Sequence, residues 1–166
     1  RPVVLKGMIL NWHLPYLASL YDDSYFLIVE RDVADNADSL LRARREFAGT
    51  EEAWYSFKPP GFRDVLSQSP QQQVAWQVMA TNDAIRRGAE AIDERRLMRV
   101  SYEDFCANPR QLLNDVCRRA GITAQPSAEL PQQFEIRRRA NRATWEPVIR
   151  SMQPLISQHE AARRSA

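Results

Sequence analysis

Arg31 and Ser39, eight residues apart where an apolar run gives way to a helical pattern, are well suited to bind an anion. The run at 26–29 leads into Arg31, and Ser39 falls in the early turns of the helix predicted around 37–44. In open α/β sheets ligands bind outside the carboxyl ends of strands, and a helix start offers free N–H groups. A guanidinium fork plus a hydroxyl can hold a phosphate. Alternatively, Arg31 pairs with a neighbouring aspartate and Ser39 faces solvent.

Two other stretches carry aromatic or basic residues. Tyr102 follows a second apolar run, and a ring with a hydroxyl suits a purine, because it can stack while its hydroxyl makes one hydrogen bond. The alternative is a partly buried core tyrosine, with the acidic pair after it at a helix start. Arg138 and Arg139 lie in a basic stretch, which by itself is typical of a solvated, arginine-rich helix end.

The elements that must position these residues follow from the hydrophobic pattern. Short apolar runs predict strands at 3–5, 25–29 and 97–100. Helical spacing predicts helices around 10–20, 37–44, 74–85 and 109–120, the last capped by Asn108 and stopped by Gly121, with a helical region toward the carboxyl end. Strands alternating with helices indicate an α/β fold with a parallel sheet. The stretch 54–70 is interpreted as a surface excursion, and 123–133 as a polar linker.

Composition narrows the class of protein. The chain has 166 residues, 44% of them hydrophobic, which is enough for one folded domain spanning residues 1–166. Its 23 basic and 21 acidic residues give a net charge of +2, and this balance argues against a nucleic-acid binder. Cys106 and Cys117 are typical of small core residues and favour a reducing, cytoplasmic compartment, a Golgi-lumenal domain being the alternative. No apolar stretch is long enough to span a bilayer.

Four segments in chain order resemble the sulfotransferase family. Arg31 and Ser39, with Asp32 and Asp35, match its Arg-Asp-Pro-x-Asp segment and the serine eight positions on, although Val33 stands where proline is frequent. The other three matches are Tyr102-Glu103-Asp104-Phe105, the stretch from Arg138-Arg139 to Trp145, and Lys6. The resemblance implies a P-loop-like parallel sheet flanked by helices, of which this chain is a helix-rich, carboxyl-terminal part.

The family's chemistry is implied by the same resemblance. Its co-substrate is 3′-phosphoadenosine 5′-phosphosulfate (PAPS), whose sulfuryl group passes without a metal to a hydroxyl or amine. The acceptor could be a small molecule, a carbohydrate or a tyrosine side chain. Arg31, Ser39, Arg138 and Arg139 would bind the 3′-phosphate, and Tyr102 would lie near the adenine.

Three further residues have implied roles with plainer alternatives. Phe134 could pack on the adenine or simply be a core residue. Lys6 would stand near the sulfuryl group, where it neutralises developing charge. His13 is a candidate base, although a helix-surface or capping role is the alternative.

The family's glycine loop for the 5′-phosphosulfate has no counterpart among the five glycines of this sequence. We therefore expect the loop upstream of Arg1, and no turnover by this segment alone. Two other functions stay open: a P-loop kinase-like phosphoryl transferase, and a non-enzymatic helical interaction module with an arginine-rich tail.

Overall fold

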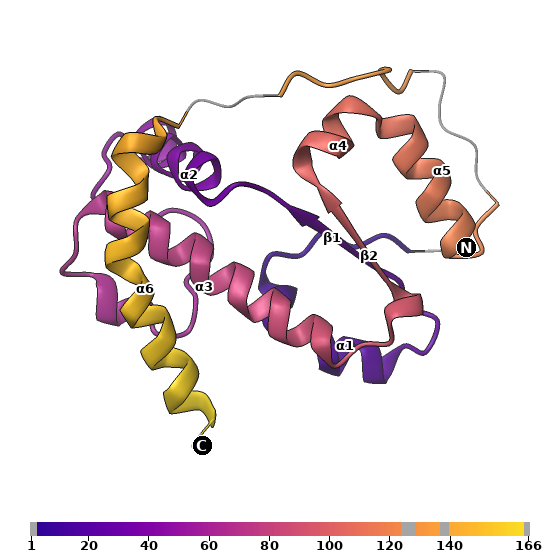
Figure 1. Cartoon of the computed structure of the whole chain (residues 1–166), viewed down its shortest axis with the longest axis horizontal. Coiled ribbons are helices and arrows are strands. Elements are labelled where there is room, and N and C mark those ends of the chain that lie inside the picture. Colours follow the sequence, from indigo (N-terminus) through magenta and orange to yellow (C-terminus); the bar gives the residue numbers. More distant parts are fainter. Residues whose placement is uncertain (1–2, 124–128, 137–139, 165–166) are drawn as a thin grey trace. The chain divides into compact units, whose positions relative to one another are not determined.

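The computed structural model describes residues 3–123, 129–136 and 140–164, with side chains to residue 158 (Figure 1). Most of the described residues are helical. In chain order the elements are a 3-10 helix η1 (Ile9–Trp12), α1 (Leu14–Leu20), β1 (Phe26–Glu30), α2 (Val33–Ala48), η2 (Phe62–Val65), α3 (Pro70–Glu90), η3 (Glu94–Arg96), β2 (Leu97–Ser101), α4 (Tyr102–Ala107), α5 (Pro109–Arg119) and α6 (Arg142–Arg164).

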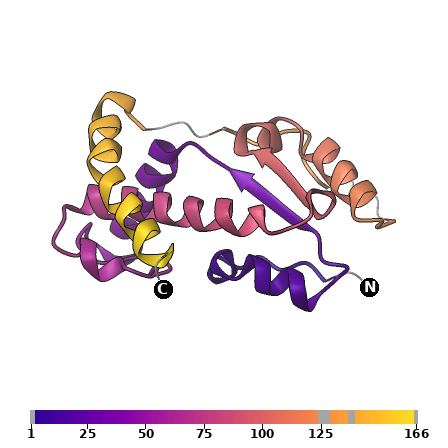
Figure 2. The same cartoon turned by 60° about the horizontal axis from the view of Figure 1, so that its bottom comes forward.

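The two strands form a parallel pair. Phe26 lies opposite Leu97 and Glu30 opposite Ser101, so the strands start and end in step. Both views show the two arrows side by side with their heads at the same end (Figure 1 and Figure 2). The strands predicted at 25–29 and 97–100 are confirmed to within one residue, and the parallel pairing agrees with the α/β expectation.

The strand predicted at Val3–Leu5 is wrong. These residues have no regular structure, and their exposed fractions are 81%, 90% and 73%. A β-strand needs a neighbour for its backbone N–H and C=O groups, and the described residues supply none at this point. Lys6 consequently lies in an irregular segment before η1 and not at the end of a strand.

The chain divides into two compact units, which we describe separately. Unit 1 contains residues 1–31 and 85–137, and unit 2 contains residues 32–84 and 138–166. In unit 1, Leu14 and Ala18 of α1 pack with Ile92, joined by partly buried Phe26 and Leu97 of the two strands. This cluster fixes α1 against the sheet, since burying apolar surface is the main favourable term in folding.

Arg96 ties the turn between α1 and β1 to the start of β2. Its Nε donates to the carbonyl of Ser24 at 3.0 Å, and its Nη2 donates to the carbonyls of Ala18 at 3.1 Å and Tyr21 at 2.6 Å. The Ser24 hydroxyl is a fourth partner. One guanidinium thus satisfies several backbone acceptors that the end of α1 leaves open.

Unit 2 has a larger core built from α2, α3 and α6. Trp76 and Val74 of α3 are fully buried, and α6 contributes Trp145, Met152 and Ile156, spaced by seven and four residues on one face. The amino end of α6 lies beside α2 in both views (Figure 2). Burial of Trp145 therefore fixes where α6 begins.

The excursion between α2 and α3 is held by buried polar groups. Arg44 of α2 is fully buried and donates to the Glu51 carbonyl at 3.1 Å and to Gln73 Oε1 at 2.9 Å. Desolvation lowers the pKa of Arg44, while Glu52 and Glu51 act to raise it. Gln77 donates to the carbonyls of Tyr55 and Phe57 at 3.2 and 2.7 Å. Between α2 and α3 the regular element is η2, and the expected surface excursion is partly packed into the core, because Pro59 and Val65 are fully buried.

The end of α5 confirms the predicted glycine stop. The helix begins at Pro109, although Asn108 makes no side-chain cap bond. Gly121 has φ +65°, and the N–H of Ile122 donates to the Cys117 carbonyl at 2.8 Å. This is the Schellman arrangement, in which a left-handed residue follows the helix. Cys106 and Cys117 are both buried free thiols, in agreement with their expected core role.

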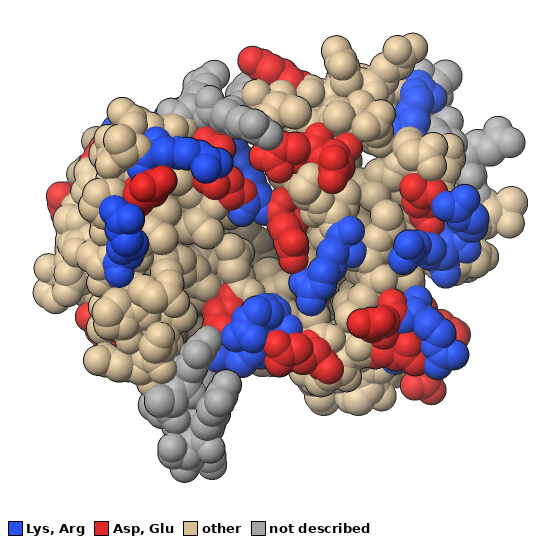
Figure 3. Space-filling model, viewed as in Figure 1, with Lys and Arg blue, Asp and Glu red and all other residues tan. Residues whose placement is uncertain are grey.

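Charges of both signs are interspersed on the face of the molecule shown in Figure 3. Of the helices in the described part of the chain, none combines the length and the apolarity that crossing a bilayer requires.

Candidate functional site

In unit 1, Arg31 and Tyr102 meet at the carboxyl ends of the two strands. Because Glu30 pairs with Ser101, the next residue of each strand leaves the sheet at the same level. The Arg31 guanidinium carbon lies 4.5 Å from the centroid of the Tyr102 ring, which is cation–π distance. The family resemblance implied a shared ligand for these residues, and the structure brings their side chains into direct contact.

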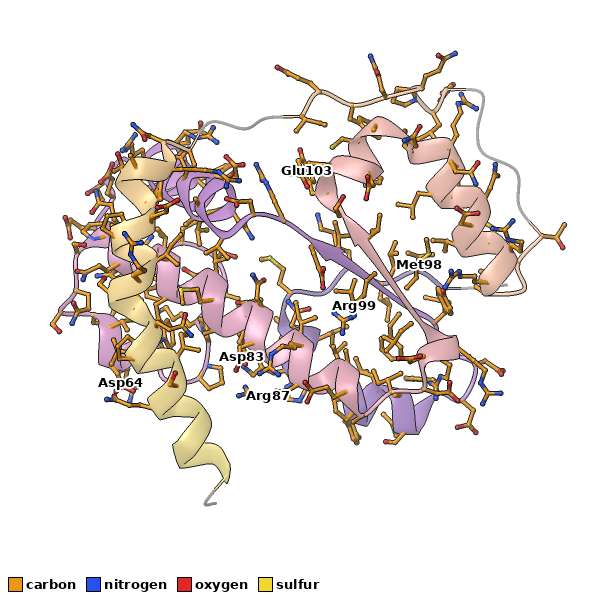
Figure 4. All side chains as sticks on the ribbon, viewed as in Figure 1. Asp64, Asp83, Arg87, Met98, Arg99 and Glu103 are labelled. Atoms are coloured by element: carbon orange, nitrogen blue, oxygen red, sulfur yellow. The ribbon has the colours of Figure 1, made fainter. Side chains whose placement is uncertain are left out.

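The chain turns into α4 directly after β2. Ser101 is the N-cap, its hydroxyl accepting from the Asp104 N–H at 2.9 Å, and Glu103 and Asp104 occupy the first helical turn. Acidic residues are favoured there by the positive end of the helix dipole. The expectation that this acidic pair belongs to a helix start is thus confirmed. Figure 4 labels Glu103 at this point, directly after Tyr102.

In unit 2, the two aspartates that follow Arg31 organise the amino end of α2. The Asp32 carboxylate caps the helix by accepting from the Asp35 N–H at 3.0 Å. Asp35, 7% exposed, accepts through Oδ1 from the backbone N–H of Ala140 at 3.1 Å. Asp32 also pairs with Arg142, Nη2 to Oδ2, at 3.2 Å. The start of α2 and residues 140–142 are therefore joined by two polar contacts.

Ser39 lies on the same stripe of α2 as Asp32 and Asp35. Residues three, four and seven apart share one face of an α-helix, so Ser39 is one turn beyond Asp35. It is half-buried. Arg31 belongs to unit 1 and Ser39 to unit 2, and each is described within its own unit.

The basic segment of the third match falls partly outside the described residues. Arg138 and Arg139 are among the residues that the structure does not describe. Ala140, the next residue in the sequence, is bound to Asp35, and Trp145 is 4% exposed in the core of unit 2. The flank of the basic pair is thus anchored to the helix that carries Ser39.

Phe134 packs on a ring of the protein. Its ring lies 5.4 Å from that of Phe105 in a stacked arrangement, and its N–H donates to the Cys106 carbonyl at 2.7 Å. It remains 38% exposed. A contact between Phe134 and an adenine stays a prediction.

Lys6 and His13 are exposed near the amino end of unit 1. His13 precedes α1 and makes no side-chain cap bond, although its backbone carbonyl accepts from the Leu17 N–H at 2.9 Å. A Cβ at Gly7 would come within 2.7 Å of the Leu10 side chain, so the residue after Lys6 is in close contact with η1. Their catalytic roles stay predictions.

Sequence reasoning missed two features of these units. The bond from Ala140 to Asp35 involves a backbone N–H, which has no signature in a sequence. The contact of Arg31 with Tyr102 could have been anticipated, because both residues directly follow strands that were expected to be parallel.

Comparison with known proteins identifies the family. A model described as the sulfotransferase family matches residues 6–126. The chain belongs to the sulfotransferase family. The matched residues include Lys6, His13, Arg31, Ser39 and Tyr102, while Phe134 and the basic pair lie beyond them. No curated protein and no solved structure gave a significant match.

Proposed function

We propose that this sulfotransferase takes its sulfuryl group from PAPS and passes it to a hydroxyl or amine of a small molecule or carbohydrate. The observation that carries the proposal is the juxtaposition of Arg31 and Tyr102 at the carboxyl ends of neighbouring parallel strands, 4.5 Å from guanidinium carbon to ring centroid. A cation and an aromatic ring side by side suit a ligand with a phosphate next to a purine.

Tyr102 is the proposed adenine contact. Its ring is half-buried and already carries the Arg31 guanidinium on one side, which keeps the ring in place. A base can stack on such a ring with a gain of about 1–3 kcal/mol. Phe134 is a second proposed contact, held on α4 by Phe105.

Arg31 and Ser39 are the proposed ligands of the 3′-phosphate, together with Arg138 and Arg139. The support in unit 2 is that Ser39 shares a helix face with Asp35, which holds the residue immediately after the basic pair. Phosphate contacts from several arginines are short and charge-assisted, so this group would anchor the co-substrate.

The chemical step we propose is an in-line displacement. Its rate would come from positioning and from stabilising negative charge on the leaving phosphate oxygen. Lys6 is the proposed source of that positive charge, and His13 a proposed base for the acceptor. The excursion at 51–70, with Trp54 and Phe62 in edge-to-face contact at 5.6 Å, is the proposed acceptor-side wall.

Family membership favours sulfuryl over phosphoryl transfer, and nucleotide preference separates the two. We expect the chain to bind adenosine 3′,5′-bisphosphate in the absence of Mg²⁺ and more tightly than ATP with Mg²⁺. The opposite order would support the kinase-like function. The helical interaction module predicts that neither nucleotide binds.

Isothermal titration with adenosine 3′,5′-bisphosphate tests the proposal. Arg31→Ala should weaken binding by about tenfold to a hundredfold, because a hydrogen bond to a charged group contributes about 1.5–3 kcal/mol. Arg95→Ala is the matched control: it removes the same charge at the opposite end of the sheet, where Arg95 pairs with Asp93 at 2.6 Å. Equal loss in both variants would show nonspecific attraction, and unchanged binding in Arg31→Ala would refute the assigned anchor.

A further inference from the structure

Arg44 is a charged side chain enclosed in unit 2, near the carboxyl end of α2, and its exposed fraction is 0%. One of its terminal nitrogens, Nη1, donates to the Glu51 carbonyl at 3.1 Å and to Gln73 Oε1 at 2.9 Å. The guanidinium carbon lies 5.0 Å from the centroid of the Trp54 ring, which is cation–π distance. Both hydrogen bonds that Arg44 makes are therefore made by the same nitrogen.

The other two nitrogens of Arg44 form a fork of donors that nothing accepts from. Nε and Nη2 are both buried, and neither has a hydrogen-bond partner in the part of the chain that the structure describes. In a planar guanidinium the Nε–H and one N–H of Nη2 point to the same side, away from the side-chain stem. Two such parallel donors match two oxygens of one carboxylate, sulfate or phosphate.

The positive charge of Arg44 also lacks a carboxylate in contact with it. The Glu51 carboxylate pairs with Arg45 and accepts from Gln71 at 3.4 Å, and Glu52 is exposed. Desolvation lowers the pKa of Arg44, and the charges of Glu52 and Glu51 oppose this through space. A buried charge is costly unless a counter-charge contacts it. A water molecule could accept from the fork but would leave the charge unpaired, whereas an anion satisfies both needs.

The excursion that follows α2 covers part of Arg44. Glu51 and Trp54, which contact the guanidinium, both belong to it, and Gln77 of α3 holds two further backbone carbonyls of the same segment. Loops open locally more readily than the helices around them. An anion can therefore reach Arg44 when the excursion opens, and it is enclosed when the excursion closes.

We propose that the Nε–Nη2 fork of Arg44 binds an inorganic tetrahedral oxyanion from solution, sulfate or phosphate, and that this anion fixes the excursion on α2. Chloride has no pair of oxygens to match the fork and should bind more weakly. The site lies within unit 2, and it does not depend on the proposed nucleotide site, whose anchor is Arg31 of unit 1.

Thermal unfolding of the full chain in up to about 20 mM sulfate tests the site, with sodium chloride adjusted to hold the ionic strength constant. The wild type should show a saturable rise in Tm of at least about 3 °C, because a ligand that binds only the folded state stabilises it. Arg44→Lys keeps the charge without the fork and should lose the saturable rise. Sulfate also stabilises proteins in general through its exclusion from their surface, but that effect does not saturate and should remain in the variant.

Arg42→Ala is the matched control on the same helix. Arg42 pairs with Asp38 within α2 at 3.1 Å, so this variant removes an equal charge and should keep the sulfate dependence of the wild type. Arg31→Ala should keep it too, because Arg31 belongs to the proposed nucleotide site. A dependence that is lost in Arg31→Ala but kept in Arg44→Lys would place the sulfate at the nucleotide site and overturn the inference.

A crystal structure of the wild type with selenate locates the anion directly if Arg44→Lys does not fold, since selenium gives an anomalous signal. We expect a selenate with two oxygens about 2.7–2.9 Å from Nε and Nη2 of Arg44. A fork occupied by the carboxylate of Glu52, or by water alone, overturns the inference. So does a wild type without a saturable rise in Tm, or an equal rise in the wild type and Arg44→Lys.

Discussion

Replacing Arg96 by alanine should destabilise the start of β2, the strand that leads to Tyr102. The guanidinium holds the carbonyls of Ala18, Tyr21 and Ser24 at 2.6–3.1 Å, and β2 begins at the next residue. Arg96 is half-buried, so water can replace part of what is lost. A hydrogen bond to a charged group contributes about 1.5–3 kcal/mol when shielded, and exposure reduces this.

We therefore expect Arg96→Ala to lower the free energy of unfolding by about 2 kcal/mol in urea denaturation. For a chain of this length that corresponds to a fall in Tm of about 4–8 °C. Arg96→Lys should recover only part of the loss, because an ammonium cannot reproduce the planar fork of donors.

Arg95→Ala is the control for the Arg96 experiment. The side chain next door is 89% exposed and pairs only with Asp93 among the salt bridges of the described residues, so its removal should leave the midpoint unchanged. If both variants have the same stability, the carbonyls of the 18–24 turn do not depend on Arg96, and the reasoning is refuted.

Three further predictions concern single residues. Tyr102→Phe should bind adenosine 5′-phosphate nearly as well as the wild type, and Tyr102→Ala about tenfold more weakly by titration, since stacking needs the ring; equal binding by both would exclude an adenine contact. Gly121→Ala should lower the free energy of unfolding by about 1 kcal/mol in urea denaturation. The cost comes from the backbone, because φ is +65° and no atom lies within 4 Å of the added Cβ. Gly121→Asn should lower the free energy of unfolding less. A hydrogen bond from the Arg95 side chain lowers the pKa of Asp93 from 3.8 to about 2. An NMR titration of Asp93 should therefore show a midpoint of about 2 in the wild type and about 3.8 in Arg95→Ala. Because both side chains are exposed, the pair adds little to stability, in line with its use as the control above.

The sequence predicted those parts of the fold that depend on local patterns. The runs at 25–29 and 97–100 became strands because each finds the other as a partner. The run at 3–5 is also apolar but has no such partner among the described residues, so it is not a strand. A hydrophobic pattern indicates which side chains can be buried. Whether a run forms a strand also depends on a second strand that can pair with it.

The residues of the site were predicted, but the contacts between them were not. Arg31 and Tyr102 were assigned to one ligand by the family resemblance, and the register explains why they touch. The anchoring of Ala140 by Asp35 was not foreseen, because it joins a side chain to a backbone group far away in the sequence. Such contacts depend on how unit 2 folds as a whole.

A crystal structure of the chain with adenosine 3′,5′-bisphosphate tests the central claim most directly. The account predicts oxygens of the 3′-phosphate about 2.7–2.9 Å from guanidinium nitrogens of Arg31, with the Ser39 hydroxyl on the same group and the adenine against Tyr102. A nucleotide bound elsewhere, with Arg31 and Ser39 contacting different groups or none, would contradict it.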